Sequence, residues 1–437
     1  MGLIQINSLD FCTMEKIKYS IWRKRSQDEI QQRVATALNK NVNFNEQTIL
    51  GLPASYLDQE VFSHDSNLLK NAPFLTSLVH NPNHIGCHTL GESENYFEGT
   101  HQIEKELIEI CAVDFLKSKP NSCDGYVASG GTEANIQAIW MYRNFFKNKE
   151  KAAQDEICIL CSEDSHYSMN KASNLLDISI FQFEVDTNTR LGKKESIDSQ
   201  IQKAKENGKK HFIVILNMMT TMFGSVDEIS PILASLKKQE CSFKIHVDGA
   251  YGGFYYPFVN KNNELNFENP AISSVTLDAH KMCQAPYGTG ILLARKGLIN
   301  HTGTKATYVQ GNDFTLIGSR SGANAIAVWM ILSKHGPYKW TEKTFILEKR
   351  TSWICKQLDE LEVTYYRNPH SNIVTMRAND SLKKISKKFG LVPDNHNNPN
   401  WYKIVVMDHV TIEKLELFAT ELELALVENE QNLAVLV

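Results

Sequence analysis

The chain has 437 residues, of which 42% are hydrophobic and 22% are charged, and its formal net charge is -4. We expect one large domain with smaller flanking pieces, because a single hydrophobic core stops growing at roughly 250–300 residues. The weakly acidic balance gives no electrostatic basis for binding nucleic acid, and no apolar run approaches the roughly 20 residues that span a bilayer. The sequence therefore predicts a cytoplasmic protein with neither a nucleic-acid partner nor a membrane partner.

The cysteines and histidines give no sign of a metal site. Nine cysteines, an odd number, are scattered along the chain, which is typical of reduced thiols rather than a disulfide framework. Cys158 and Cys161 form a C-x-x-C pair, but they lie in an apolar, strand-like segment, where residues three apart point to opposite faces. His84 and His88 have the spacing of one helical face, yet neighbouring proline and glycine residues argue against a helix there. We expect no metal.

The first two thirds of the chain divide into an arm and an alternating region. Residues 1–75 combine helical periodicity at 14–38 with a turn-rich stretch at 67–75, and they look like an N-terminal arm whose apolar face needs a partner surface. From about residue 99 helices alternate with short apolar strands, which indicates parallel strands joined by helical crossovers. The expected helices are 100–116, 132–146, 167–176 and 229–238, and the expected strands are 126–128, 157–160, 212–216, 243–247, 274–277 and 290–293.

The last third predicts a second, smaller α/β domain. A long helical region, 324–361, precedes two strand candidates at 373–376 and 403–407 and two helices at 381–389 and 411–427. The predicted organisation is an N-terminal arm at 1–75, a large domain with a mainly parallel sheet at 76–315, and a small C-terminal domain at 316–437.

The segment SGGTEAN, residues 129–135, lies between an expected strand and an expected helix. Such a turn can hold a phosphate group, because Gly130 and Gly131 let the backbone approach an anion and the helix start supplies N–H groups. The Thr132 hydroxyl adds a donor. The alternative is an ordinary strand-to-helix turn that Thr132 caps.

Two further motifs follow strand ends, which face the ligand crevice of a parallel sheet. In HVDGA, residues 246–250, Asp248 can hold a heterocyclic nitrogen protonated and Ala250 leaves room for a flat ring, although a turn aspartate is the alternative. In DAHK, residues 278–281, Lys281 becomes nucleophilic if its pKa is lowered, whereas a solvated His280–Lys281 pair is the alternative. Together the three motifs match the anchored phosphate, the protonated pyridine nitrogen and the Schiff base of pyridoxal phosphate.

With these motifs in this order, the sequence resembles the group II pyridoxal-phosphate-dependent decarboxylases of fold type I, the aspartate-aminotransferase fold, over about residues 75–345. The segments GYVASGGTEANIQA, HVDGAYGGF, DAHKM and TLIGSRSGAN are most similar to the archaeal-type tyrosine/aspartate decarboxylases. The resemblance implies a homodimer that converts an L-amino acid to its amine and CO₂. It also implies the cofactor contacts: Gly130, Gly131 and Thr132 to the phosphate, Asp248 to the pyridine nitrogen, Ala250 behind the ring, and a Schiff base at Lys281 beside His280.

The resemblance assigns roles to residues outside these motifs as well. His166 matches the family histidine that stacks on the cofactor ring, and Thr220 matches a segment near the cofactor, although Met219 replaces the usual glycine. Tyr308 lies where the family has a mobile active-site loop, and it is the candidate proton donor to the carbanion, with a surface tyrosine as the alternative. Arg320 suits a substrate carboxylate or, equally, a salt bridge at the domain junction.

Other functions remain open from the sequence. A carbon–carbon lyase or an amine-oxidising aldehyde synthase would use the same lysine, acid and phosphate turn, and a non-catalytic homologue would keep only the fold. The intact set of His166, Asp248 and Lys281 favours an enzyme. Residues 84–98 are expected by family position to help line the substrate pocket. Their mixed chemistry does not select one substrate: tyrosine or another aromatic amino acid, histidine, aspartate and glutamate all remain open. An aromatic amino acid or aspartate/glutamate is the favoured expectation.

Overall fold

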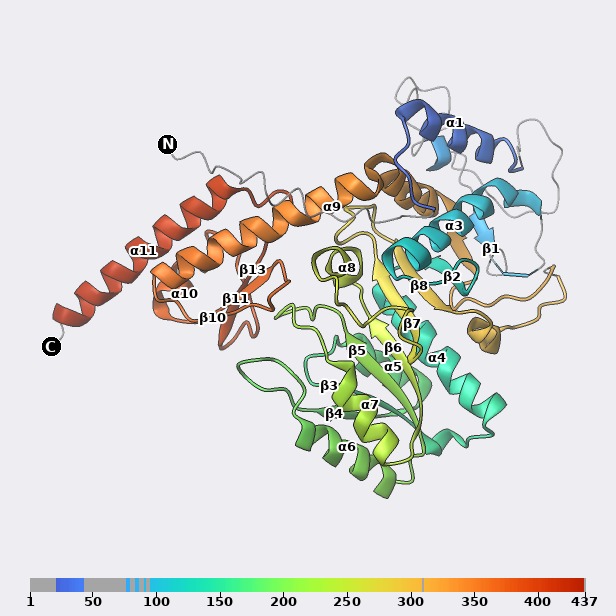
Figure 1. Ribbon diagram of the computed structural model, residues 1–437, viewed down its shortest axis with the longest axis horizontal. Helices are drawn as coiled ribbons and strands as arrows, with labels where there is room; N and C mark the ends of the chain where they lie inside the picture. Colours follow the sequence, from blue (N-terminus) through green and yellow to red (C-terminus); the bar gives the residue numbers. More distant parts are fainter. Residues whose placement is uncertain are drawn as a thin grey trace.

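The structure is a computed structural model that describes residues 21–42, 76–78, 83–85, 90–91, 95–308 and 310–435. A large domain is built on a seven-stranded sheet, and a small domain carries the C-terminal helix (Figure 1). The long helix α9 (Gly322–Glu360) runs from one domain to the other. None of the helices in the described part of the chain has both the length and the apolar character to cross a membrane.

The large sheet has the strand order β2-β8-β7-β6-β5-β3-β4. Strands β4, β3, β5, β6 and β7 pair in parallel, whereas β8 is antiparallel to both β7 and β2. The predicted mainly parallel sheet is confirmed. The strands are β2 (Cys123–Ala128), β3 (Ile157–Ser162), β4 (Ser179–Phe183), β5 (His211–Asn217), β6 (Ser242–Asp248), β7 (Ile272–Asp278) and β8 (Gly290–Arg295).

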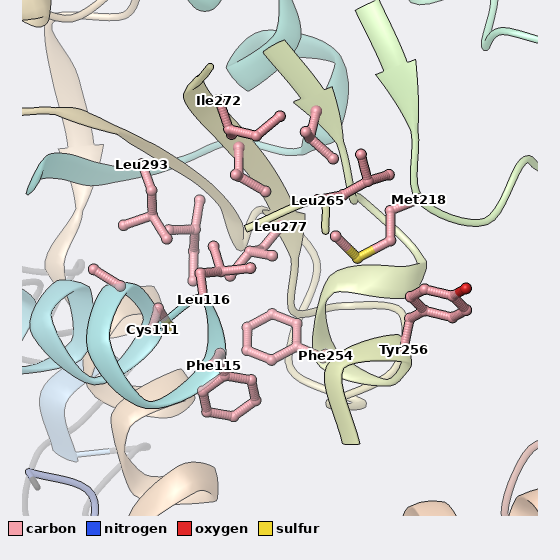
Figure 2. Packing of buried hydrophobic residues seen from close by; sticks show 14 of the residues in the cluster. Cys111, Phe115, Leu116, Met218, Phe254, Tyr256, Leu265, Ile272, Leu277 and Leu293 are labelled. Carbon is pink, nitrogen blue, oxygen red and sulfur yellow. The ribbon is translucent and has the colours of Figure 1, made fainter. Parts of the chain in front are cut away.

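Helices cover both faces of this sheet, and each face has its own apolar cluster. Cys158 belongs to one cluster and Cys161 to the other, as predicted for residues three apart on a buried strand. Figure 2 shows part of the first cluster, where Leu277 of β7 lies near Leu116 and Phe254. Helices α3, α6 and α7 contribute to that cluster, and α4 and α5 contribute to the other.

The helical elements of the large domain largely match the expected ranges. The helix expected at 100–116 is α3 (Glu98–Ile110) continued by a π turn, η3 (Cys111–Phe115). The others are α4 (Gly131–Lys149), α5 (Ser168–Leu176), α6 (Lys194–Glu206), α7 (Ile229–Lys238), α8 (Tyr256–Val259) and the 3₁₀ turns η2 (Asn95–Phe97), η4 (Gln154–Glu156), η5 (Gly252–Phe254) and η6 (Leu298–Thr302).

Helix α9, expected as one helix over 324–361, is two helices joined at a kink. Gly336 has φ = 63° and precedes Pro337, and a Cβ on Gly336 would lie 2.6 Å from Cβ of Lys24. The N-terminal segment therefore passes so close that only glycine fits without a shift. The small domain beyond the kink has an antiparallel sheet, β10-β11-β13-β12, formed by β10 (Tyr365–Tyr366), β11 (Ile373–Arg377), β12 (Val392–Pro393) and β13 (Trp401–Val405), with helices α10 (Asp380–Ser386) and α11 (Ile412–Val435).

The described part of the predicted N-terminal arm packs on the large domain. Helix α1 (Gln27–Leu38) begins at a capping box, in which Ser26 and Glu29 accept hydrogen bonds from each other's backbone N–H groups, and it contacts α3 and α9. The Trp22 ring stacks on Phe115 at 4.6 Å between centroids. Strand β1 (Asn83–Ile85) pairs with β9 (Ser319–Ser321). The start of the helix expected at 14–38 and the turn-rich stretch at 67–75 lie outside the described residues.

Candidate active site

The three predicted motifs meet in one cavity of about 340 Å³ at the carboxyl ends of the parallel strands. This volume lies within the range of small-molecule sites, roughly 300–1,000 Å³. The lining includes every residue that the sequence assigned to the cofactor: Gly130, Gly131, Thr132, His166, Thr220, Asp248, Ala250, His280 and Lys281. Because these residues come from five different strand ends and turns, the arrangement depends on the parallel sheet.

The turn before α4 has the features of a phosphate site. Helix α4 starts directly after Gly130, an N-cap residue that has no side chain to cap the helix. A Cβ on Gly131 would lie 3.0 Å from Cβ of Ala250 and 3.2 Å from Oδ2 of Asp278, so a larger residue here would crowd the turn. Glu133 turns back and accepts hydrogen bonds from Ser129 N–H (2.6 Å) and from a tyrosine hydroxyl. The helix start with its positive dipole end therefore faces the cavity.

Asp248, the last residue of β6, is held in one orientation. Its Oδ2 accepts a hydrogen bond from Nδ2 of Asn135 (2.8 Å), and its Oδ1 accepts one from the N–H of Ala250 (3.1 Å). The side chain lines the cavity although the residue is only 8% exposed. A fixed, nearly buried carboxylate of this kind suits a protonated ring nitrogen, because the opposite charge stabilises the proton.

Lys281 lies beside a buried carboxyl that also contacts the phosphate turn. Its Nζ is 4.0 Å from Oδ2 of Asp278, and Nδ1 of His280 is 2.7 Å from Oδ1 of the same residue. The N–H of Gly131 donates to Oδ2 of Asp278 (3.1 Å). Burial raises the pKa of Asp278, while His280 and Lys281 act in the opposite direction. The Lys281 side chain keeps 33% of its surface exposed, so its amine remains accessible to an aldehyde.

His166 follows β3 and lines the cavity with a neutral ring. The Ser168 N–H, which can only donate, points to Nδ1 at 3.2 Å, and Oγ of Ser168 lies 2.9 Å from the same atom. The ring proton therefore resides on Nε2. Burial lowers the pKa of His166, as does nearby Lys281, and a neutral, oriented ring suits stacking. Tyr167 packs against it with ring centroids 4.1 Å apart.

Two predicted residues do not line the cavity. The Tyr308 side chain is 88% exposed on the loop that follows η6. Arg320 is buried, and its guanidinium donates to both carboxylate oxygens of Glu104 (2.5 and 3.3 Å) and to the carbonyl of Val127 (3.2 Å). These contacts are those of the salt-bridge alternative, and the substrate role of Arg320 and the proton-donor role of Tyr308 stay predictions.

Thr220 lines the cavity, where its hydroxyl is hydrogen-bonded to Ser225 (2.7 Å).

Several polar residues that line the cavity were given no role from the sequence, among them Asn135, Asn217 and Asp278. Asn217 ends β5, and its backbone N–H and its Nδ2 both donate to Oδ2 of Asp227 at 2.7 Å. Burial raises the pKa of Asp227 to about 7. Asn217 and Asp278 could have been found from their positions at strand ends, and Asn135 from its spacing of three from Thr132 on the same helical face.

Part of the predicted pocket lies outside the described residues. Within the expected segment 84–98, residues 86–89 and 92–94 lie outside the described residues, and His88 is among them. Over the described ranges, the structure contains no group of three or more histidine, cysteine, aspartate or glutamate side chains placed to hold a metal ion. All seven cysteines in those ranges are free thiols.

The residues of the cavity fit pyridoxal phosphate. A helix start behind a glycine turn suits the phosphate, a fixed carboxylate suits the ring nitrogen, and an accessible lysine amine suits the aldehyde. When bound, the cofactor supplies an electron sink for the pair left on the substrate carbon.

Comparisons with known proteins identify the family of this chain. The model of the pyridoxal-dependent decarboxylase conserved domain matches residues 103–344. The chain is 48% identical to the tryptophan decarboxylase of Clostridium sporogenes over 92% of this chain and 97% of that protein. It is 31% identical to the probable L-tyrosine/L-aspartate decarboxylase of Methanocella arvoryzae, over 80% and 92%. The structure of Lactobacillus brevis glutamate decarboxylase is similar with a TM-score of 0.66 at 17% identity, covering 96% of each chain, and shows the shared fold. The chain therefore belongs to the pyridoxal-phosphate-dependent decarboxylases and is an amino-acid carboxy-lyase that uses this cofactor.

Proposed function

We propose that the substrate is an aromatic L-amino acid, with tryptophan the foremost candidate, which the enzyme converts to the corresponding amine and CO₂. The observation that carries the proposal is the 48% identity to a tryptophan decarboxylase over nearly the whole of both chains. The cavity gives a second argument, since no arginine is among its described lining residues. Aspartate or glutamate would bring a second carboxylate, which needs a cationic partner. The only lysine in that lining is Lys281, which is already assigned to the cofactor.

The residues of the site would have separate tasks. The backbone of Gly130 and Gly131 and the Thr132 hydroxyl hold the phosphate at the start of α4. Asp248 keeps the ring nitrogen protonated, and Lys281 binds the cofactor carbonyl through its amine. The His166 ring stacks on the cofactor and so fixes the plane to which the scissile bond must be perpendicular.

Tyr308 is the proposed donor of the proton that replaces CO₂ on the substrate carbon. Its exposure of 88% means that this role requires a second surface to close over the loop. We therefore propose a homodimer, and from the sequence we propose that it is cytoplasmic. Its support is that large apolar or aromatic side chains are exposed over one stretch of the chain, at Tyr287, Tyr308, Leu316 and Ile317, as expected of an association surface. Light scattering of the cofactor-loaded protein tests the assembly, and a monomer at micromolar concentration would contradict it.

The substrate is tested by incubating the purified, cofactor-loaded protein with an equimolar pool of L-tryptophan, tyrosine, phenylalanine, histidine, aspartate and glutamate. Mass spectrometry then identifies each amine and each aldehyde. We expect the amine of an aromatic amino acid to form first. Amines from the acidic amino acids alone would contradict the proposed substrate, and aldehyde with peroxide in place of amine would favour the oxidative alternative.

A further inference from the structure

A buried polar network lies behind Asp248, on the sheet face that α4 covers. His246 and Asp248 are two apart on β6 and share this face, and they pair in register with Ser274 and Thr276 of β7. His246 and Ser274 are fully buried, yet neither lines the cavity. Burying polar groups between a sheet and a helix is unfavourable unless they are hydrogen-bonded. Contacts with the cofactor therefore do not explain why these polar side chains are buried here.

Asn135 of α4 joins this network to the cavity. Its Nδ2 donates to Oδ2 of Asp248 (2.8 Å) and to Oγ of Ser168 (3.1 Å), and Ser168 contacts Nδ1 of His166 (2.9 Å). Its Oδ1 faces Nε2 of His246 (3.0 Å). One asparagine, only 1% exposed, thus connects the two side chains assigned to the cofactor ring.

The proton positions in the network follow from the donors and acceptors. A carboxylate only accepts, so the Asn135 amide must present Nδ2 to Asp248 and Oδ1 to His246, and Nε2 of His246 must carry a proton. Burial lowers the pKa of His246 to about 4, so its ring is neutral and Nδ1 accepts from Oγ of Ser274 (2.6 Å). The same Oγ is hydrogen-bonded to the Tyr142 hydroxyl, which also lies 3.4 Å from the carbonyl oxygen of Ile245. The bonds from Ser274 to His246, from His246 to Asn135 and from Asn135 to Asp248 therefore all donate toward Asp248. Nε2 of His246 also lies 3.1 Å from Oγ1 of Thr276.

We propose that Asn135 and His246 are positioning residues of the decarboxylation, which hold the Asp248 carboxylate in the one orientation that serves the cofactor ring nitrogen. The proposal rests on the proposed role of Asp248. Two of the lone-pair directions of the carboxylate are occupied by Asn135 and by the Ala250 N–H, which leaves the remaining ones for the cavity. Without Asn135 the carboxylate can rotate, and without the His246 proton the Asn135 amide can turn over and face Asp248 with its oxygen.

The test uses the cofactor-loaded protein and three readouts: the absorbance of the Lys281–cofactor linkage against pH, the affinity for pyridoxal phosphate, and kcat. Asp248→Asn is the reference, because losing its charge removes the ring-nitrogen proton and should raise the pKa of the linkage. Asn135→Leu, of similar size, should raise that pKa as well and lower kcat by roughly 10- to 100-fold, the usual effect of losing a hydrogen bond to a charged group. His246→Phe should act in the same direction.

Two variants separate positioning from general structural support. His246→Gln retains an N–H donor for Asn135 Oδ1 and should restore the linkage pKa toward that of the wild type. The matched control is Gln137→Met, which removes another buried amide of α4 whose bonds go to Thr302 and Phe314 and do not involve Asp248. This control should leave the linkage pKa unchanged.

The outcomes are distinct. An Asn135→Leu variant with the linkage pKa and kcat of the wild type, or a His246→Gln variant no better than His246→Phe, overturns the positioning role. A Gln137→Met shift as large as that of Asn135→Leu does so too. If Asp248→Asn itself leaves the titration unchanged, the proposed role of Asp248 is the part that fails. Should His246→Phe not fold, Ser274→Ala replaces it, since it removes the donor that fixes the His246 proton on Nε2.

Discussion

Among the ion pairs of the described residues, the one between Arg320 and Glu104 is the most buried, and its removal should destabilise the protein. The two side chains are 4% and 0% exposed, and Glu104 also accepts a hydrogen bond from the N–H of Val127 (2.7 Å). Arg320→Met leaves the Glu104 carboxylate buried without its counter-charge, which should lower the free energy of unfolding by about 3–5 kcal/mol. Urea unfolding followed by fluorescence and by circular dichroism measures the change.

A second variant shows whether Arg320 also serves the substrate. Arg320→Met combined with Glu104→Gln removes both charges and keeps an acceptor for the Val127 N–H, so most of the lost stability should return. The control is Lys356→Met, which breaks an exposed pair with Glu360 and should cost less than about 1 kcal/mol. If Arg320→Met alone stays within about 1 kcal/mol of the wild type, the reasoning on the buried pair is refuted. A restored double variant with a KM at least tenfold higher would support carboxylate binding by Arg320.

Three further predictions concern the lysine, the loop tyrosine and the buried histidine. Lys281→Ala should lose the absorbance of the covalent cofactor linkage together with activity, and a persisting band would contradict the assignment. Tyr308→Phe should form less amine and more aldehyde and peroxide, and an unchanged amine yield would exclude Tyr308 as the donor. His246 has a pKa of about 4 when folded against 6.5 in the reference state, so the unfolded chain binds its proton first. Stability should therefore fall by up to about 3 kcal/mol as the pH drops from 6.5 to 4, and His246→Gln should remove this component of the pH dependence.

Strong hydrophobic patterns made most of the large domain predictable, and weak patterns account for the elements that were missed. Strand β4 and helix α6 were not predicted. Helix α6 is mostly polar and buries only Ile197, Ile201 and Ala204, a narrow stripe that a sequence window averages away. Strand β8 was predicted, but its direction was not, because an apolar strand looks the same in either orientation. The connection of only 11 residues after Asp278 holds no helix and favours an antiparallel neighbour.

The site residues that follow strand ends could be predicted from the sequence. The residues that support them could not, because they lie on elements that only the fold brings together. Arg320 shows the limit, since its partner Glu104 is 216 positions away and no local pattern predicts the pair. The network around His246, in contrast, can be recognised from a pattern in the sequence. In HVD and SVT, polar residues alternate with valine on the sheet face that α4 covers, whereas β3 and β5 place the apolar residues Ile159, Ile213 and Ile215 on that face. Polar residues repeated at a spacing of two on two such strands indicate a hydrogen-bonded layer beneath a helix. This hydrogen-bonded layer ends at Asp248. The alternation of polar residues and valine therefore identifies Asp248 as the carboxylate that the surrounding side chains hold in place.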